Sequence, residues 1–178
     1  MATTKWVLDP GHSELGFKVK HLMVTNVSGS FKNFSVTAET TDDDFANAVV
    51  DFSADATSIT TNNEQRDEHL KSADFFDTTN FPTLNFKATK FEQSGDDGEY
   101  ELTGNLTMKG VTKPVKLKVE FGGIVKDPWG NTKAGFTVSG KINRKDFGLN
   151  WNAALETGGV MVSEDVRINS EIQLIKQA

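Results

Sequence analysis

The side chains in this sequence that could carry out acid–base or metal chemistry are three histidines and the charged residues near them. His12, His21 and His69 lack the i, i+4 spacing by which a helix presents two metal ligands. The 178 residues include no Cys, which excludes zinc–thiolate sites, iron–sulfur clusters and cysteine nucleophiles. We therefore expect no metal and no cofactor. His12 follows a turn and is expected to be a hydrogen-bonded structural residue.

Two short segments combine basic and acidic side chains. Arg66, Asp67 and His69 lie in one, and Arg144 and Asp146 in the other. A hydrolytic triad would also need a serine on a G-x-S-x-G turn, which is absent, so we predict that the protein is not an enzyme. Two interpretations remain. The segments form a polar gate for the head group of a ligand, or their Arg–Asp pairs tie a helix and loops to the rest of the fold.

A helix is expected at the first of these segments. Thr61-Asn62-Asn63-Glu64 fits a capping box, in which the Thr and Glu side chains satisfy each other's free amides. The pattern predicts one short polar helix around 62–71 in a chain that otherwise reads as strands.

The strand signal is alternation of apolar and polar residues, which is typical of strands with one buried face. In residues 115–121, for example, Val115, Leu117, Val119 and Phe121 alternate with Lys116, Lys118 and Glu120. The apolar face is rich in Phe, with 13 Phe but 1 Tyr and 3 Trp, which favours a dry interior because Phe has no polar atom to satisfy. About eight strands are predicted, at 14–21, 34–38, 50–56, 84–88, 99–109, 115–121, 136–142 and 166–174.

These strands must bury one apolar face and protect two sheet edges. A single short helix cannot cover such a sheet, but closure into a barrel solves both problems. We therefore predict an all-β fold, a closed antiparallel eight-stranded barrel over residues 1–178 as a single domain; a two-sheet sandwich is the rival. Alternation alone does not distinguish a core filled by side chains from a ligand pocket.

Several short segments occur in an order and spacing that carry more information than each segment alone. They include Asp9-Pro10-Gly11-His12-Ser13, Arg66-Asp67-Glu68-His69-Leu70-Lys71-Ser72, Gly104-Asn105-Leu106-Thr107-Met108-Lys109-Gly110 and Ile142-Asn143-Arg144-Lys145-Asp146-Phe147-Gly148. Together they resemble the YceI-like family, lipocalin-like barrels that bind polyisoprenoid or related long-chain lipids. The match covers nearly the full length, although the Gly-x-Trp of ordinary lipocalins is absent near Trp6.

The resemblance implies a barrel that binds and sequesters or carries an isoprenoid chain, such as a polyprenyl quinone or polyprenyl phosphate. The alternative is a structural or partner-binding barrel with a filled core. The residues predicted to line the site are Phe17, Val19, Phe34, Phe52, Phe86, Leu102, Leu106, Leu117, Val119, Phe136 and Val138, with His21, Arg66, His69 and Arg144 near the head group.

Net charge and hydropathy limit which partners and which cellular location we expect for this protein. A net charge of -6 and a pI of about 5.1 argue against a nucleic-acid footprint. No apolar run approaches the ~20 residues of a spanning helix. The first residues lack the apolar stretch of a signal peptide, so a cytoplasmic location is expected, with the periplasm as the alternative if a leader was removed. The resemblance allows a homodimer.

Overall fold

The computed structural model describes residues 3–22, 24–95, 98–149 and 162–177, and these residues form eleven strands and one α-helix. The helix is α1 (Glu64–Lys71), and short 3₁₀ turns lie at Pro10–His12, Ala56–Ser58 and Arg144–Phe147. No helix within the described ranges is long and apolar enough to cross a membrane. The strands are β1 (Thr3–Leu8), β2 (Glu14–His21), β3 (Thr25–Phe31), β4 (Phe34–Thr41), β5 (Asp44–Asp55), β6 (Ile59–Thr60), β7 (Thr83–Gln93), β8 (Glu99–Met108), β9 (Val111–Lys126), β10 (Thr132–Asn143) and β11 (Val162–Lys176).

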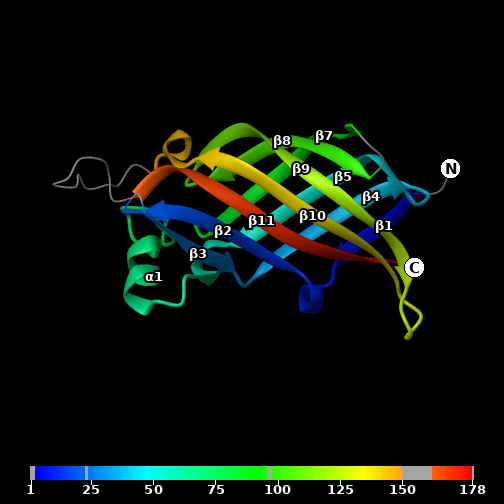
Figure 1. The fold of residues 1–178 in the computed structure, drawn as a ribbon, viewed down its shortest axis with the longest axis horizontal. Helices are drawn as coiled ribbons and strands as arrows, with labels where there is room; N and C mark the ends of the chain where they lie inside the picture. Colours follow the sequence, from blue (N-terminus) through cyan, green and yellow to red (C-terminus); the bar gives the residue numbers. More distant parts are fainter. Residues whose placement is uncertain (1–2, 23, 96–97, 150–161, 178) are drawn as a thin grey trace.

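Eight of these strands close a ring in the order β1-β4-β5-β7-β8-β9-β10-β11, with β11 pairing back to β1 (Figure 1). All the pairings are antiparallel, and the predicted closed eight-stranded barrel is confirmed. The ring closes through β1, a strand that alternation did not predict because only Trp6 in it is fully buried.

The predicted strand at 14–21 exists as β2 but has a different place. β11 is long enough to pair with β2 near its start, where Val162 lies opposite His21, and with β1 near its end, where Leu174 lies opposite Leu8. β1 and β2 thus follow each other along one edge of β11. β3 and β6 extend the sheet from β2.

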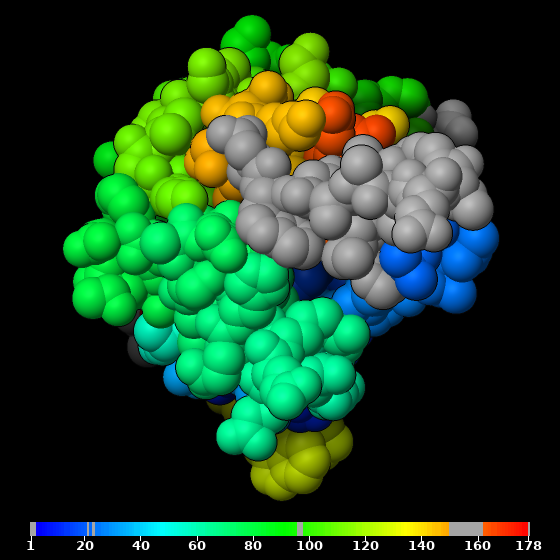
Figure 2. All heavy atoms as spheres, turned by 90° about the vertical axis from the view of Figure 1, so that its left-hand side faces the viewer, coloured from blue at the N-terminus to red at the C-terminus, as the bar shows by residue number. Residues whose placement is uncertain are grey.

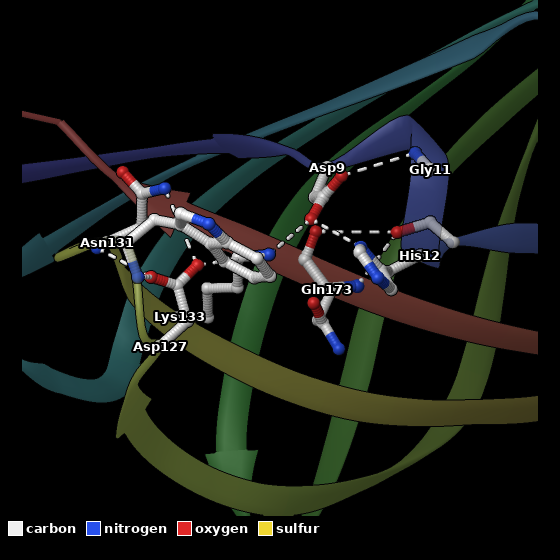
Figure 3. A network of polar contacts seen from close by, with 9 residues as sticks. Asp9, Gly11, His12, Asp127, Asn131, Lys133 and Gln173 are labelled. Atoms are coloured by element: carbon white, nitrogen blue, oxygen red, sulfur yellow. Dashed lines mark hydrogen bonds and ion pairs between the residues drawn. The ribbon is translucent and has the colours of Figure 1, made fainter.

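A polar network holds residues 9–13, the β1–β2 turn that joins these two strands (Figure 3). The Lys133 Nζ donates to Asp9 Oδ2 at 2.8 Å and lies 3.5 Å from Asp127 Oδ2. Asp9 Oδ2 is also 2.9 Å from His12 Nδ1, so His12 has the structural hydrogen bond expected of it. Asp127 accepts from the backbone amides of Trp129 and Asn131. The network therefore fastens the β1–β2 turn to the β9–β10 hairpin.

Two opposite charges in this network stabilise each other. The hydrogen bond from Lys133 lowers the pKa of Asp9 below 3.8, outweighing the effect of burial, and the same bond raises the pKa of Lys133 above 10.5. The stability contributed by Asp9 is present above pH 3.8 and lost as pH falls through its folded pKa. That contributed by Lys133 is present below pH 10.5 and lost as pH rises through its folded pKa.

The helix lies where the sequence predicts it, but the predicted capping box is wrong. The N-cap is Asn63, whose Oδ1 accepts from the Arg66 amide at 3.0 Å. Thr61 instead donates its amide and its hydroxyl to Asp67 Oδ1, at 2.8 and 2.6 Å. Asn62 has a left-handed φ of 61° and turns the chain between the two, which puts Thr61 outside the first helical turn.

Figure 1 places α1 at one end of the barrel and both chain termini at the other. The end away from α1 is closed by packed aromatic rings. Trp6 is fully buried, its indole Nε1 donates to Thr40 Oγ1 at 3.0 Å, and its ring centroid lies 4.9 Å from that of Phe45. Beneath α1 a second group of buried residues includes Phe31 and Phe75.

Candidate ligand-binding site

A cavity of about 590 Å³ lies inside the barrel, so side chains do not fill the interior. Its size falls within the range of roughly 300–1,000 Å³ that is usual for small-molecule sites. The wall is overwhelmingly apolar. Most of its polar residues lie near α1, among them Lys20, Asn63, Gln65, Arg66 and His69, whereas Ser170 lines the wall from the middle of β11. Figure 2 looks onto this end, where α1 and the blue β2–β3 segment lie on two sides of a recess.

Three glycines let large side chains lie flat against the wall. A Cβ on Gly29 would lie 2.4 Å from the ring of Phe17, and one on Gly104 would lie 2.5 Å from the ring of Phe86. A Cβ on Gly140 would lie 2.4 Å from a methyl group of Leu117. Carbon atoms in contact normally lie about 3.5–4.0 Å apart. The glycines therefore keep these side chains out of the space that forms the cavity.

Most residues predicted to bind a ligand share this cavity wall. Contact with a ligand stays a prediction for each of them, but the fold brings their side chains from separate strands to one space. Those that line the cavity are Phe17, Val19, Phe52, Arg66, His69, Phe86, Leu102, Leu106, Leu117, Val119, Phe136, Val138 and Arg144.

Two predicted residues are not placed on the wall. Phe34 is half-buried on β4 and is not among the lining residues; its ring centroid lies 6.2 Å from that of Phe52, which does line the cavity. Phe34 thus supports a wall residue from the side. His21 is the last residue of β2, and its side chain lies outside the described part of the structure.

Alternation missed two aromatic residues that line the deep part of the cavity, Phe45 and Phe91. The pairing of β7 with β8 shifts register between Ala88 and Lys90. Such a bulge inserts one residue, so the inward face passes from even-numbered Phe86 to odd-numbered Phe91. In β5, Phe45 and Val50 both line the cavity although they differ in parity, and Asn47 between them has a φ of 63°. A prediction that assumes a strict period of two therefore misses the shift of the inward face in both β5 and β7.

The deep end of the cavity is an aromatic cluster centred on Phe45. Its ring centroid lies 4.9 Å from those of Trp6 and Phe136 and 5.5 Å from that of Phe121. Contacts of this kind each contribute about 0.5–1.5 kcal/mol beyond the burial of area. The cluster therefore forms a firm floor opposite the polar end.

Arg66 and His69 at the polar end are held by neighbours. Arg66 donates from Nε to Thr61 Oγ1 at 2.8 Å and from a terminal nitrogen to Thr61 O at 2.9 Å. His69 Nε2 lies 2.9 Å from Asp74 Oδ2, and its ring meets the Phe75 ring edge-on. The Arg66 bonds fix α1 to the segment before it and the His69 contacts fix it to the segment after it, whereas the sequence suggested ties made by Arg–Asp pairs. Arg66 and His69 both line the cavity as well.

Arg144 is a buried cation on the wall. Its guanidinium donates to the carbonyls of Leu149, Ser163 and Val162 at 2.6, 2.8 and 3.3 Å, which joins the end of β10 to the start of β11. Burial lowers the pKa of Arg144, although a guanidinium stays charged in proteins. Arg144 thus ties these segments together through backbone carbonyls, where the sequence suggested an Arg–Asp pair.

The cavity wall combines a large apolar surface with a few basic side chains. In the part of the chain that the structure describes, the ionisable residues on this wall are Lys20, Arg66, His69 and Arg144, all basic and all at or near the α1 end. Among the described residues no three His, Cys, Asp or Glu side chains are grouped to hold a metal ion. The arrangement suits an apolar chain whose head group accepts hydrogen bonds or carries negative charge.

Comparisons with known proteins agree with this architecture. A UPF0312 protein of Staphylococcus aureus strain MSSA476 is 41% identical over 171 residues, 96% of each chain. The solved YCEI protein of Campylobacter jejuni is 32% identical, with 96% of this chain and 97% of that chain covered and a TM-score of 0.76. A polyisoprenoid binding domain from Saccharophagus degradans shares the fold at 16% identity, with 97% and 98% covered and a TM-score of 0.66. The YceI-like domain model matches residues 6–174, and the chain therefore belongs to the YceI-like family.

Proposed function

We propose that this protein binds a long-chain lipid inside the barrel, an isoprenoid chain with its head group near α1, and sequesters or carries it. The observation that carries the proposal is the apolar cavity of about 590 Å³ with basic residues gathered at one end. The polyisoprenoid binding domain from Saccharophagus degradans is a precedent for such an occupant in this fold.

The driving force is removal of the apolar chain from water. Each buried CH₂-sized unit contributes about 0.8 kcal/mol, so a chain of modest length gains useful affinity without a polar contact. The floor at Phe45 closes the deep end, and the polar side chains lie at the other. A chain would therefore lie with its tail at the floor and its head group between α1 and β2.

Two head groups fit the basic side chains there. A polyprenyl phosphate would be attracted by the charges of Lys20 and Arg66, whereas a polyprenyl quinone would accept hydrogen bonds from the same donors. The charge gives the phosphate the stronger interaction. Adding salt should accordingly weaken the binding of a phosphate more than that of a quinone.

The test is native mass spectrometry of the freshly purified protein, followed by organic extraction. We expect an adduct with the mass of a long-chain lipid. Protein stripped by extraction and refolded should then take up an isoprenoid alcohol, phosphate or quinone from ethanol. Protein that carries no extractable lipid and takes up none of the three would refute the proposal.

A matched pair of variants locates the site. Val138 lines the cavity, whereas Val49 is exposed on the outside of β5. Val138→Trp should block uptake, because the indole occupies the space of the chain, and Val49→Trp should leave it unchanged. Equal uptake by both variants, each folded by circular dichroism, would show that the ligand lies elsewhere.

A further inference from the structure

The tip of the β2–β3 hairpin exposes apolar side chains. Leu22 is 40% exposed and Val24 is 77% exposed. Leu22 also has a left-handed φ of 54°, a conformation that Gly or Asn adopts at lower cost. Turn chemistry therefore does not account for the large apolar side chain at this position. Strained backbone of this kind points to a function of the side chain that it presents.

A row of basic residues crosses the outer face of the neighbouring strands. Lys141 lies opposite Arg167, and Arg167 lies opposite Lys18, in the register of β10, β11 and β2. All three are exposed. Lys141 pairs with Asp165 at 3.5 Å, but within the described ranges neither Lys18 nor Arg167 makes an ion pair. Like charges directly opposite each other repel and destabilise the sheet. An anionic surface that approaches these three basic side chains would reduce this repulsion.

The apolar tip and the basic row lie beside the polar end of the cavity. Val19, Lys20 and Val27 belong to the same hairpin and line the cavity. Lys20 is two residues from Leu22, about 7 Å along an extended strand. The hairpin thus places a charged face, an apolar tip and part of the cavity wall next to one another.

We propose that this hairpin docks on the surface of an anionic phospholipid bilayer, with Leu22 and Val24 entering the head-group region and Lys18 and Arg167 facing the lipid phosphates. A bilayer suits the site because the apolar tip adjoins both the basic row and an apolar cavity. That the docked protein exchanges lipid with the membrane rests on the proposed function; the docking itself does not.

The charge of α1 fixes the orientation. Glu64 and Glu68 are exposed on α1, and Glu68 Oε1 lies 3.6 Å from Lys71 Nζ. Figure 2 shows α1 on the other side of the recess from the β2–β3 segment. The two glutamates are repelled by an anionic surface, so the protein approaches with the β2–β3 side first. Glu64→Gln combined with Glu68→Gln should strengthen vesicle binding, because it removes this repulsion.

The experiment measures sedimentation of the full chain with vesicles of phosphatidylcholine containing phosphatidylglycerol, and with vesicles of phosphatidylcholine alone. We expect binding to the anionic vesicles only. Each Lys or Arg near such a surface contributes about fivefold in affinity, so Lys18→Gln with Arg167→Gln should weaken binding about 25-fold. Leu22→Ser with Val24→Ser should weaken it about tenfold.

The chain offers a matched control at its other end. Val125 is 66% exposed and Trp129 is 82% exposed near the tip of the β9–β10 hairpin, so this hairpin also presents two exposed apolar side chains. Val125→Ser with Trp129→Ser should leave vesicle binding unchanged. Lys87→Gln with Lys113→Gln, on the exposed face of β7 and β9, controls for loss of positive charge.

Uptake of an isoprenoid alcohol delivered from ethanol separates the two proposals. The Leu22→Ser, Val24→Ser variant should take up the alcohol as well as the wild type and lose only vesicle binding. Vesicle binding without any uptake would refute the proposed function and support the docking. Equal binding to both kinds of vesicle, or loss of binding in the Trp129 control, would overturn the docking. Absence of vesicle binding would overturn it too, and would favour an acidic protein as the partner of this face.

Discussion

Replacing Gly140 with Ala should reduce the cavity without touching its wall directly. The new Cβ would lie 2.4 Å from Leu117 Cδ2, whereas the nearest backbone atoms are 3.6 and 3.7 Å away. Because ordinary carbon contacts are about 3.5–4.0 Å, the Leu117 methyl must retreat by more than about 1 Å. Leu117 lines the cavity, so we expect its side chain to move toward the interior.

The magnitude follows from the space that the methyl takes. Displacing one or two CH₂-sized units of a ligand costs about 0.8 kcal/mol each, which weakens binding about 4- to 15-fold. Gly104 gives a contrasting case, since its Cβ would lie 2.6 Å from the Lys87 carbonyl oxygen and 2.9 Å from the Ala88 Cα. Backbone cannot retreat as a side chain can, so Gly104→Ala should lower the free energy of unfolding by about 1–3 kcal/mol.

The assay is titration of stripped protein with an isoprenoid alcohol, followed by native mass spectrometry, beside urea unfolding of each variant. Leu117→Ala introduced into Gly140→Ala should restore affinity, because it removes the displaced methyl. A Gly140→Ala protein that is folded and binds as tightly as the wild type would refute the reasoning. Failure of Leu117→Ala to rescue a weakened variant would show that the effect of Gly140 arises elsewhere.

Three further predictions concern the floor, the polar network and the buried cation. Phe45→Ala should lower the free energy of unfolding by about 3–5 kcal/mol and shift preference toward longer chains; an unchanged preference in competition binding would show that Phe45 does not limit length. Asp9→Asn should destabilise the protein at pH 7, with a difference in urea midpoint that vanishes well below pH 3.8 and well above pH 10.5; a difference independent of pH would contradict the pairing with Lys133. Arg144→Met should cost about 1.5–3 kcal/mol in urea unfolding, because it leaves carbonyls unpaired, and an unchanged midpoint would contradict this.

The sequence predicted the barrel wall better than its ends. Leu117 and Val119 alternate regularly with lysines, and both lie on the inward face, because a paired strand fixes side-chain direction at every second residue. Phe45 and Phe91 were missed because each is separated by an irregularity from the regular part of its strand. The wrong capping box has a similar origin: Thr61 and Asn63 are both residue types that cap helices, and the backbone turn at Asn62 decided between them.

Strand partners also depended on distant contacts. Nothing local in Thr3–Leu8 distinguishes a closing strand from a terminal extension, and its role follows from pairing with β11 more than 160 residues later. The Asp9–Lys133 ion pair joins residues that are 124 apart in the sequence. It holds the β1–β2 turn in place, so that β1 and β2 can both pair with β11.

By itself the sequence determined the fold class, the helix and most inward-facing residues, because these depend on local period and turn chemistry. Whether the inward face encloses protein or space was decided only by the tertiary structure. The same inward-facing residues, such as Phe17, Phe86 and Leu117, would serve a filled core or a hollow barrel. In the fold, these side chains lie against the wall because neighbouring strands place a glycine beneath each of them, at Gly29, Gly104 and Gly140. The cavity is therefore a property of cross-strand packing, which no single segment of the chain specifies.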